Sequence, residues 1–273
     1  MKLGVFVSLD KDIDEQFKIV AESGFTACQL STCDDARETD EIAAQVNEAS
    51  KKYNVEVSAY WKGWDDPKVW NFTEGYTTLG IVPTTYRHLR LNQLKHGSDF
   101  AKKIGVKNLI THVGFIPENP WSTEYHDVVS AVRTIAKYCK ENDQYFLFET
   151  GQETPVTLLR IIEDVGTGNL GINLDTANLI IYGKGNPVDA LEVFGKYVRT
   201  LHLKDGIFPW EGYRLGKETK IGEGKVDFEK VFKMLKELNF DGIMSIEREI
   251  TGDQQMIDII ESKKYFEDIL SRL

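Results

Sequence analysis

Four side chains able to bind a metal ion occur at the ends of strand-like segments in the second half of the chain. They are Glu149 in Tyr-Phe-Leu-Phe-Glu, Asp175 in Leu-Gly-Ile-Asn-Leu-Asp, His202 in Thr-Leu-His-Leu-Lys-Asp and Glu247 in Ile-Met-Ser-Ile-Glu. Three carboxylates that met without a counter-charge would repel one another and raise their pKa values, and a divalent cation resolves that repulsion. Three oxygen donors and one imidazole suit Mn²⁺, our first expectation, with Mg²⁺, Co²⁺ or Zn²⁺ as alternatives. The sequence therefore predicts one divalent metal held by these four residues.

Other residues near the same strand ends are candidates for substrate contacts. His112 ends the fourth strand-like segment, and Lys204 follows His202 by two residues and shares its facing. The alternative for His112 is a buried core histidine, and the alternative for Lys204 is a salt bridge. Glu153 could bind a substrate hydroxyl or could begin the next helix, where an acid suits the helix dipole. The predicted substrate contacts are His112, Glu153, Lys204, Asn178, Trp61 and Gln29.

Alternating segments indicate which elements position these residues. Short β-branched or aromatic runs recur along the chain between longer segments with helical periodicity, such as Asp227–Leu238. Parallel strands need crossover connections, and eight strand–helix units are what a closed barrel requires. An open doubly wound sheet would show the same alternation, but the count of eight favours a single (β/α)8 TIM barrel. The predicted strands are Leu3–Val7, Phe25–Leu30, Val55–Tyr60, Asn108–Val113, Tyr145–Glu149, Leu170–Asp175, Arg199–Lys204 and Gly242–Glu247.

Two connections are longer than is usual in α/β proteins. Trp61–Pro83 carries three of the five tryptophans, and Asp205–Val226 carries another. Both leave the carboxyl ends of strands, where barrel enzymes place their active sites. We expect them to wall a pocket for a polar, ring-shaped ligand, with packing onto the barrel as the alternative. Gly222-Glu223-Gly224 in the second connection predicts a tight turn before a helix cap at Asp227 rather than a phosphate-binding loop.

Composition narrows the function classes. The chain has 273 residues, close to the roughly 250 of one barrel, so we expect one domain over residues 1–273. A net charge of −10 without a basic run argues against nucleic acid as a partner. The N-terminal apolar run is too short for a signal peptide or a membrane span. Three cysteines without metal-type spacing fit a reducing compartment, and we expect a cytoplasmic protein that does not bind membranes.

Five motifs carry a resemblance to a known group of proteins. They are Phe148-Glu149-Thr150, Asn173-Leu174-Asp175-Thr176, Leu201-His202-Leu203-Lys204-Asp205, Ile221-Gly222-Glu223-Gly224 and Ile246-Glu247. On these motifs, and over almost its entire length, the chain resembles the sugar phosphate isomerases and epimerases of the xylose-isomerase-like TIM-barrel superfamily. Relatives in that superfamily often form dimers or tetramers, so a homo-oligomer is open here.

The resemblance implies a metal-dependent isomerase or epimerase acting on a sugar, sugar acid or cyclitol. A metal on the four ligands would chelate a carbonyl and an adjacent hydroxyl of the substrate and stabilise an enediolate. Glu149 and Glu247 are then the catalytic acid and base: one removes the proton and the other returns it. Asn178 stands where ketose epimerases usually carry a histidine, so the resemblance does not single out a ketose as substrate.

Three other functions compete with this prediction. A lyase like inosose dehydratase would use the same site to eliminate water from a keto-polyol. A DNA repair nuclease like endonuclease IV assembles three zinc ions with many histidines, which does not suit a chain with five histidines and a charge of −10. A sugar-binding barrel without catalytic activity would hold the metal as a structural ion, in a site closed by protein ligands.

Overall fold

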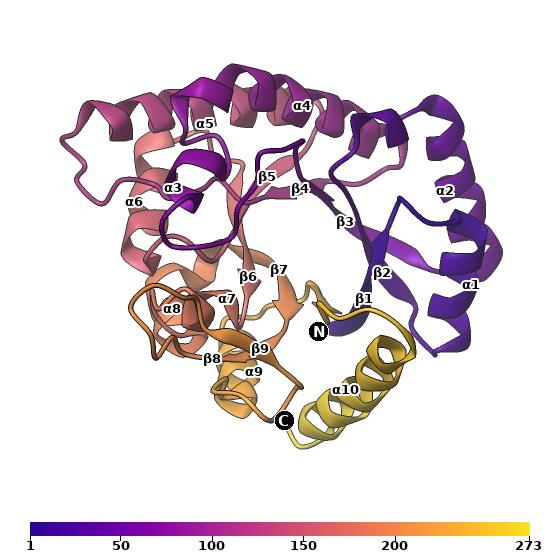
Figure 1. The fold of residues 1–273 in the computed structure, drawn as a ribbon. Coiled ribbons are helices and arrows are strands. Elements are labelled where there is room, and N and C mark those ends of the chain that lie inside the picture. Colours follow the sequence, from indigo (N-terminus) through magenta and orange to yellow (C-terminus); the bar gives the residue numbers. More distant parts are fainter.

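Eight parallel strands close into a barrel in the computed structural model, which describes residues 1–273 (Figure 1). The order around the barrel is β1-β10-β7-β6-β5-β4-β3-β2, so the first and last barrel strands are neighbours. The predicted (β/α)8 barrel is confirmed, and the open sheet is excluded. The barrel strands are β1 (Lys2–Ser8), β2 (Ala27–Thr32), β3 (Glu56–Lys62), β4 (Asn108–Thr111), β5 (Tyr145–Glu149), β6 (Leu170–Asp175), β7 (Val198–Leu203) and β10 (Ile243–Ile246).

Strands β5 and β6 have the bounds that the sequence predicts, while others differ by one or more residues at their ends. Strand β4 ends at Thr111, so that His112 lies just beyond it, and β10 ends at Ile246, directly before Glu247. Strand ladders end where the connections diverge, and local sequence does not determine that point. Both residues nevertheless stay at the carboxyl end of the barrel.

Helices form the outer layer (Figure 1). Side-chain caps mark several helix starts at the carboxyl ends of the strands, where Asp, Ser, Thr and Asn accept orphan backbone N–H groups. Asp227 accepts from the Lys230 N–H at 3.0 Å, which confirms the predicted cap. The outer helices are α1 (Ile13–Glu22), α2 (Asp40–Tyr53), α4 (Thr84–Lys103), α5 (Thr123–Glu141), α6 (Pro155–Val165), α8 (Pro187–Phe194), α9 (Phe228–Glu237) and α10 (Asp253–Ser271). Short helical turns are α3 (Gly75–Thr78), α7 (Asn178–Ile181), η1 (Asp35–Arg37) and η2 (Gly195–Tyr197).

The main core lies between the strands and the helices. All six residues of β2 and of β6 are buried, because a parallel barrel strand is covered on both faces. On α9, Phe228, Val231, Phe232 and Leu235 form the buried stripe that the helical period predicts, and each buried side chain of this size stabilises the fold by about 1.5–3 kcal/mol. None of the helices combines the length and apolar character needed to cross a bilayer.

The first long connection packs partly onto the barrel. Trp64 is buried, and the Arg90 guanidinium lies 4.9 Å from its ring centre. Trp70 is 40% exposed and therefore remains at the rim. Trp64 therefore matches the alternative that the tryptophans pack onto the barrel, and Trp70 matches the expectation that they wall a pocket.

The second long connection contains a small antiparallel hairpin of β8 (Asp205–Ile207) and β9 (Lys217–Thr219), which the sequence does not predict. The buried Asp205 carboxylate accepts backbone N–H groups of Gly206, Gly222, Gly224 and Val226 at 2.8–3.1 Å. A Cβ added at Gly224 would lie 2.0 Å from Asp205 Oδ1, so that only glycine allows this approach. These N–H groups are already bonded within the chain, which confirms the tight turn rather than a phosphate loop.

Candidate metal centre

The four predicted metal ligands converge at the carboxyl end of the barrel. One ligand atom each from Glu149, Asp175, His202 and Glu247 lies within 4.8 Å of the others. His202 Nδ1 is 3.0 Å from Glu149 Oε1 and 3.3 Å from Glu247 Oε2, and 3.9 Å from Asp175 Oδ2. The parallel register brings β5, β6, β7 and β10 side by side, so their final side chains meet although a whole strand–helix unit separates each pair in sequence.

A cavity of about 490 Å³ opens above this cluster. Glu149 and Glu247 line its wall, whereas Asp175 and His202 lie beneath it, fully buried. The cavity also has aromatic walls, formed by Phe6, Trp61, Trp70 and Tyr182. Two carboxylates are therefore open to a ligand of sugar size, and aromatic rings are available for its apolar faces.

Lys204 supplies a positive charge inside the acidic cluster. Its Nζ atom lies 3.0 Å from Asp175 Oδ2, 3.2 Å from Glu247 Oε2 and 2.9 Å from Glu249 Oε1. The side chain is 1% exposed, so the predicted salt bridge alternative describes its contacts in this structure. Burial lowers the pKa of Lys204, but the facing carboxylates outweigh burial and raise it well above its usual value.

Burial and charge act in opposite directions on the ligands. Burial raises the pKa of Asp175 to about 7, even though Lys204 opposes the shift. Burial would lower the pKa of His202, but Glu149 and Glu247 raise it to about 10. For Glu247, burial is outweighed by Lys204 and His202, which hold its pKa far below the usual value. The pKa of Glu149 is also lowered against burial, by His112 and His202. Both cavity-facing glutamates are therefore ionised at neutral pH.

The donor set fits a divalent cation. Asp175 Oδ1 accepts the backbone N–H groups of Ala177 and Asn178 at 2.8 and 2.7 Å, whereas Oδ2 has no backbone partner and forms an ion pair with Lys204 Nζ at 3.0 Å. This leaves one buried carboxylate oxygen directed at the cluster. Two further carboxylates and one imidazole nitrogen complete a set of oxygen and nitrogen ligands, which suits Mn²⁺, Mg²⁺, Co²⁺ or Zn²⁺.

Gln29 holds the other side of the His202 ring. Its side-chain amide contacts His202 Nε2, while Gln29 Oε1 is buried without a hydrogen-bond partner. A rotated amide would place Oε1 against Nε2–H and leave Nδ1 as the free lone pair that a metal requires. The orphan oxygen is thus consistent with a metal-binding tautomer of His202.

Glu149 contacts three of the predicted substrate residues. The Trp61 indole N–H donates to Glu149 Oε2, and His112 Nε2 lies 3.4 Å from the same oxygen. Asn178 Nδ2 donates to Glu149 Oε1 at 3.5 Å. Burial lowers the pKa of His112, so its ring is neutral near pH 7. Trp61, His112 and Asn178 all line the cavity, where they could contact a substrate.

The other predicted substrate residues lie away from the cavity wall. Gln29 and Lys204 are buried beneath the cluster, and their role in substrate binding stays a prediction. Glu153 is 1% exposed, and neither carboxylate oxygen has a hydrogen-bond partner. Burial raises its pKa to about 8, so it is mainly protonated at pH 7. Glu153 does not begin a helix, because α6 starts at Pro155 with Thr154 as its cap.

Sequence reasoning missed three residues at this centre. Glu249 pairs with Lys204 at the cavity wall, and Glu218 of β9 accepts the Glu249 backbone N–H at 3.1 Å. Phe6 on β1 sets its ring edge-on to His202, with ring centres 5.2 Å apart. Glu249 follows Glu247 by two residues, and in an extended segment such residues point to the same side, so this spacing could have predicted Glu249 at the site. No sequence signal connects Glu218 or Phe6 to the ligands, because both approach from strands outside the four that carry them.

Comparison with known proteins decides the family. The model of the xylose isomerase-like TIM barrel family matches residues 17–269. The chain belongs to this family. The xylose isomerase domain protein from Planctomyces limnophilus superposes on it with a TM-score of 0.93 and 31% identity, over 99% of this chain and 98% of that one.

Two further proteins that are similar to this chain carry names that mention an activity. A D-tagatose 3-epimerase-like protein is 25% identical, with a TM-score of 0.75 over 99% of this chain and 97% of that one. Inosose dehydratase from Clostridium botulinum (strain Eklund 17B / Type B) is 31% identical over 113 residues, 37% of each sequence. The chain spans 37% to 63% of the lengths of the curated relatives that it matches. Sugar-modifying enzymes of more than one reaction type are therefore found in this family.

Proposed function

We propose that the protein is a divalent-metal-dependent epimerase or isomerase of a sugar, sugar acid or cyclitol. One observation carries the proposal: of the four candidate ligands, only Glu149 and Glu247 line the cavity. Both are ionised, so each can accept a proton from carbon. Two carboxylates on one cavity wall are what proton removal and proton return require.

The metal is proposed to be Mn²⁺, held by Glu149, Asp175, His202 and Glu247. When bound, a divalent cation supplies Lewis acidity to a substrate carbonyl and acidifies the adjacent C–H bond. In this chain, one of the two glutamates removes that proton. The other glutamate first takes up a proton from solvent, and then gives that proton to the opposite face in an epimerisation, or to the neighbouring carbon in an isomerisation.

Neighbouring side chains hold the two glutamates in place. Trp61 and His112 contact Glu149 Oε2, and Lys204 fixes Glu247 Oε2 from below. Aromatic rings on the cavity wall exclude water from the apolar faces of a sugar and leave its hydroxyl groups for Asn178 and His112. These contacts support a site that is formed before the substrate arrives.

A second candidate, elimination of water from a keto-polyol, is favoured by the similarity to inosose dehydratase. It begins with the same proton removal next to a carbonyl. The reaction then proceeds by loss of a hydroxyl group on the next carbon instead of reprotonation. The product of elimination is a conjugated or dicarbonyl compound, which absorbs in the ultraviolet.

The test is a screen of ketoses, inososes and 3-keto sugars with the Mn²⁺-loaded protein in D₂O. Deuterium incorporation at carbon, followed by NMR, is expected for at least one substrate class. Absorbance of the product separates elimination from epimerisation. No exchange and no elimination in any class would refute the proposal.

Matched variants assign the exchange to the site. Glu149→Gln and Glu247→Gln should each lower the exchange rate by about 10²–10⁴-fold, the usual range for one acid–base group. Glu124→Gln alters an exposed glutamate on α5 and should leave the rate unchanged. Exchange that persists in both site variants would place the base elsewhere.

A further inference from the structure

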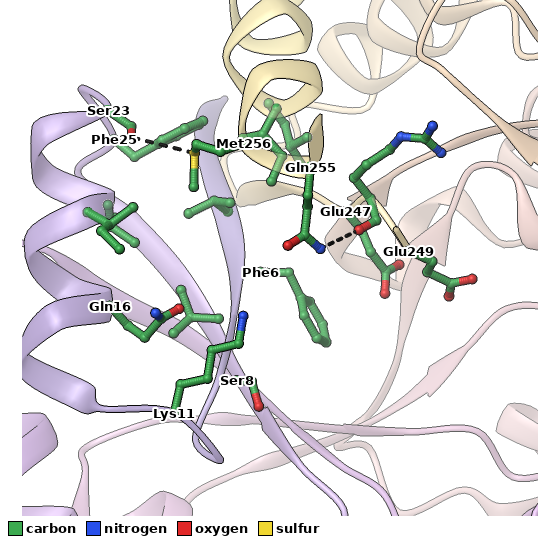
Figure 2. A pocket seen from close by; sticks show the side chains of 17 residues that line it. Phe6, Ser8, Lys11, Gln16, Ser23, Phe25, Glu247, Glu249, Gln255 and Met256 are labelled. Carbon is green, nitrogen blue, oxygen red and sulfur yellow. Dashed lines mark hydrogen bonds between the residues drawn. The ribbon is translucent and has the colours of Figure 1, made fainter. Parts of the chain in front are cut away.

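A second cavity, of about 330 Å³, lies where the first and last strand–helix units meet. Its walls come from β1 and α1 on one side and from β10 and α10 on the other, as Figure 2 shows. We call this cavity the annex. Its volume is at the lower end of the about 300–1,000 Å³ that small-molecule sites occupy.

The annex lies directly beside the proposed active site. Phe6, Glu247 and Glu249 line both cavities, so the wall between them consists of one aromatic ring and two carboxylates. In Figure 2 the Phe6 ring stands between Glu247 and Glu249 on one side and Lys11 and Gln16 on the other. A ligand held at the two glutamates would therefore have only the Phe6 ring and two carboxylates between it and the annex.

The two cavities differ in chemistry. The metal centre has carboxylates and histidines, whereas most of the annex wall is aliphatic or aromatic, with Val5, Val7, Ile19, Met256 and Ile259 among its residues. Glutamates appear in the annex only where it joins the active site. A molecule that fills both spaces can therefore place a polar end at the metal centre and an apolar group against the aliphatic side chains of the annex.

The outer part of the annex offers two unused polar groups. Lys11 is exposed and forms no ion pair, and the side-chain amide of Gln16 forms no hydrogen bond within the chain. Gln255 differs, because its amide donates to the Arg248 carbonyl at 2.7 Å. Lys11 and Gln16 can therefore bind a polar atom at the far end of an apolar group.

We propose that the annex binds an apolar substituent of the substrate, so that the enzyme acts on keto-glycosides, whose sugar ring carries the carbonyl and whose aglycone is apolar. This inference rests on the proposed function, because it uses the same two glutamates to hold the sugar. It goes beyond that function by naming the substrate class. The polar ring binds at Glu149 and Glu247, and the aglycone passes Phe6 into the annex.

The test compares the phenyl and methyl 3-keto-glycosides of glucose and galactose, with Kd measured by ligand-observed NMR on the Mn²⁺-loaded protein. At least one phenyl glycoside should bind tenfold or more tightly than its methyl counterpart. Met256→Trp fills the annex and should remove this advantage, while the Kd of the methyl glycoside stays unchanged. Ile19→Phe fills the annex from α1 and serves if Met256→Trp does not fold. Ile257→Trp adds the same ring on the exposed side of α10 and should preserve the advantage.

Equal affinity for phenyl and methyl glycosides, or no measurable binding of any phenyl glycoside, would overturn the annex proposal. An advantage that survives both Met256→Trp and Ile19→Phe would overturn it as well. The two proposals fail separately. If the phenyl compound binds more tightly and Met256→Trp removes this advantage, but no substrate exchanges a proton, the annex proposal is supported and the proposed reaction is refuted. If a substrate exchanges a proton but the phenyl compound has no advantage, the proposed reaction is supported and the annex proposal is refuted.

Discussion

Nζ of Lys204 lies 3.0 Å from Oδ2 of Asp175 and 3.2 Å from Oε2 of Glu247, and both carboxylates are buried or nearly buried. The lysine thus balances part of the negative charge at the proposed metal site. Lys204 follows His202 by two residues and points to the same side, so both residues face the same acids. The stability of the protein without metal therefore depends on this ammonium group.

Replacing Lys204 by Met should destabilise the metal-free protein by about 3–5 kcal/mol, the usual cost of leaving a buried charge without its partner. Mn²⁺ should restore part of that loss, because a divalent cation replaces the missing positive charge. Thermal unfolding in EDTA and in Mn²⁺ measures both effects. A variant as stable as the parent in EDTA would show that the carboxylates do not need Lys204.

Replacing Gln29 by Leu should weaken Mn²⁺ binding by about 10–100-fold, because a ligand histidine depends on the partner of its other nitrogen. Glu at this position can still accept from His202 Nε2–H, so Gln29→Glu should bind Mn²⁺ more tightly than Gln29→Leu. Calorimetric titration with Mn²⁺ gives both affinities. Equal affinities in parent, Leu and Glu proteins would contradict a role for Gln29 in orienting His202.

Removing the metal ligands should change metal content directly. Asp175→Asn and His202→Asn each replace a strong ligand of the cluster by a weaker, neutral amide oxygen, and both proteins should retain less than one tenth of the Mn²⁺ bound by the parent after dialysis. Mass spectrometry of the metals, normalised to protein, measures this. The matched control is His126→Asn, which changes an exposed histidine on α5 and should leave the metal content unaltered. Full metal content in both ligand variants would locate the ion elsewhere.

Glu153 should make the protein less stable as pH rises. Its pKa is raised from 4.5 to about 8, so between these values the folded state keeps a proton that the unfolded state has released. The stability associated with this proton is fully present below pH 4.5 and is lost as pH rises to 8, by at most about 1.4 kcal/mol per pH unit. Glu153→Gln removes this contribution. Urea unfolding at pH 5, 6, 7 and 8 should therefore give a flatter pH profile for the variant, and parallel profiles would show that Glu153 titrates normally.

Asp205 should be the anchor of the hairpin beside the active site. Asp205→Asn exchanges one accepting oxygen for a donor group, which leaves buried N–H groups unpaired at a cost of about 1–3 kcal/mol. Proteolytic cleavage within residues 206–226 should become faster. Asp241→Asn, an exposed change before β10, is the control and should alter neither stability nor cleavage. Unchanged cleavage in Asp205→Asn would mean that the hairpin is held by other contacts.

The fold could be predicted because each strand–helix unit has its own sequence pattern. The runs ending at Glu149 and Asp175 gave the observed strand bounds, and parallel pairing then required their carboxyl ends to meet. The convergence of the four ligands follows from this arrangement alone, although metal binding itself stays a prediction. The positions of the four candidate ligands could be predicted without knowing how the loops fold.

The remaining features depend on contacts between distant segments. Three contacts are of this kind. They are the ion pair between Lys204 and Glu249, the ring contact between Phe6 and His202, and the hydrogen bond from the Gly224 N–H to Asp205. Residue type and spacing do not determine such contacts, because they depend on how the loops fold over the barrel. For the same reason the sequence gives no indication of the annex, which exists only where the two ends of the barrel meet.

Pairing of Val5 on β1 with Ile246 on β10 joins the first and last barrel strands, so the barrel cannot close before β10 has been synthesised. Until residue 246 has been synthesised, β1 lacks one of its two neighbours, and a nascent chain carries two open sheet edges. Glu247 follows immediately, so the step that seals the barrel also delivers the last candidate ligand. A chain that stops before residue 247 would therefore lack both barrel closure and one of the four candidate ligands.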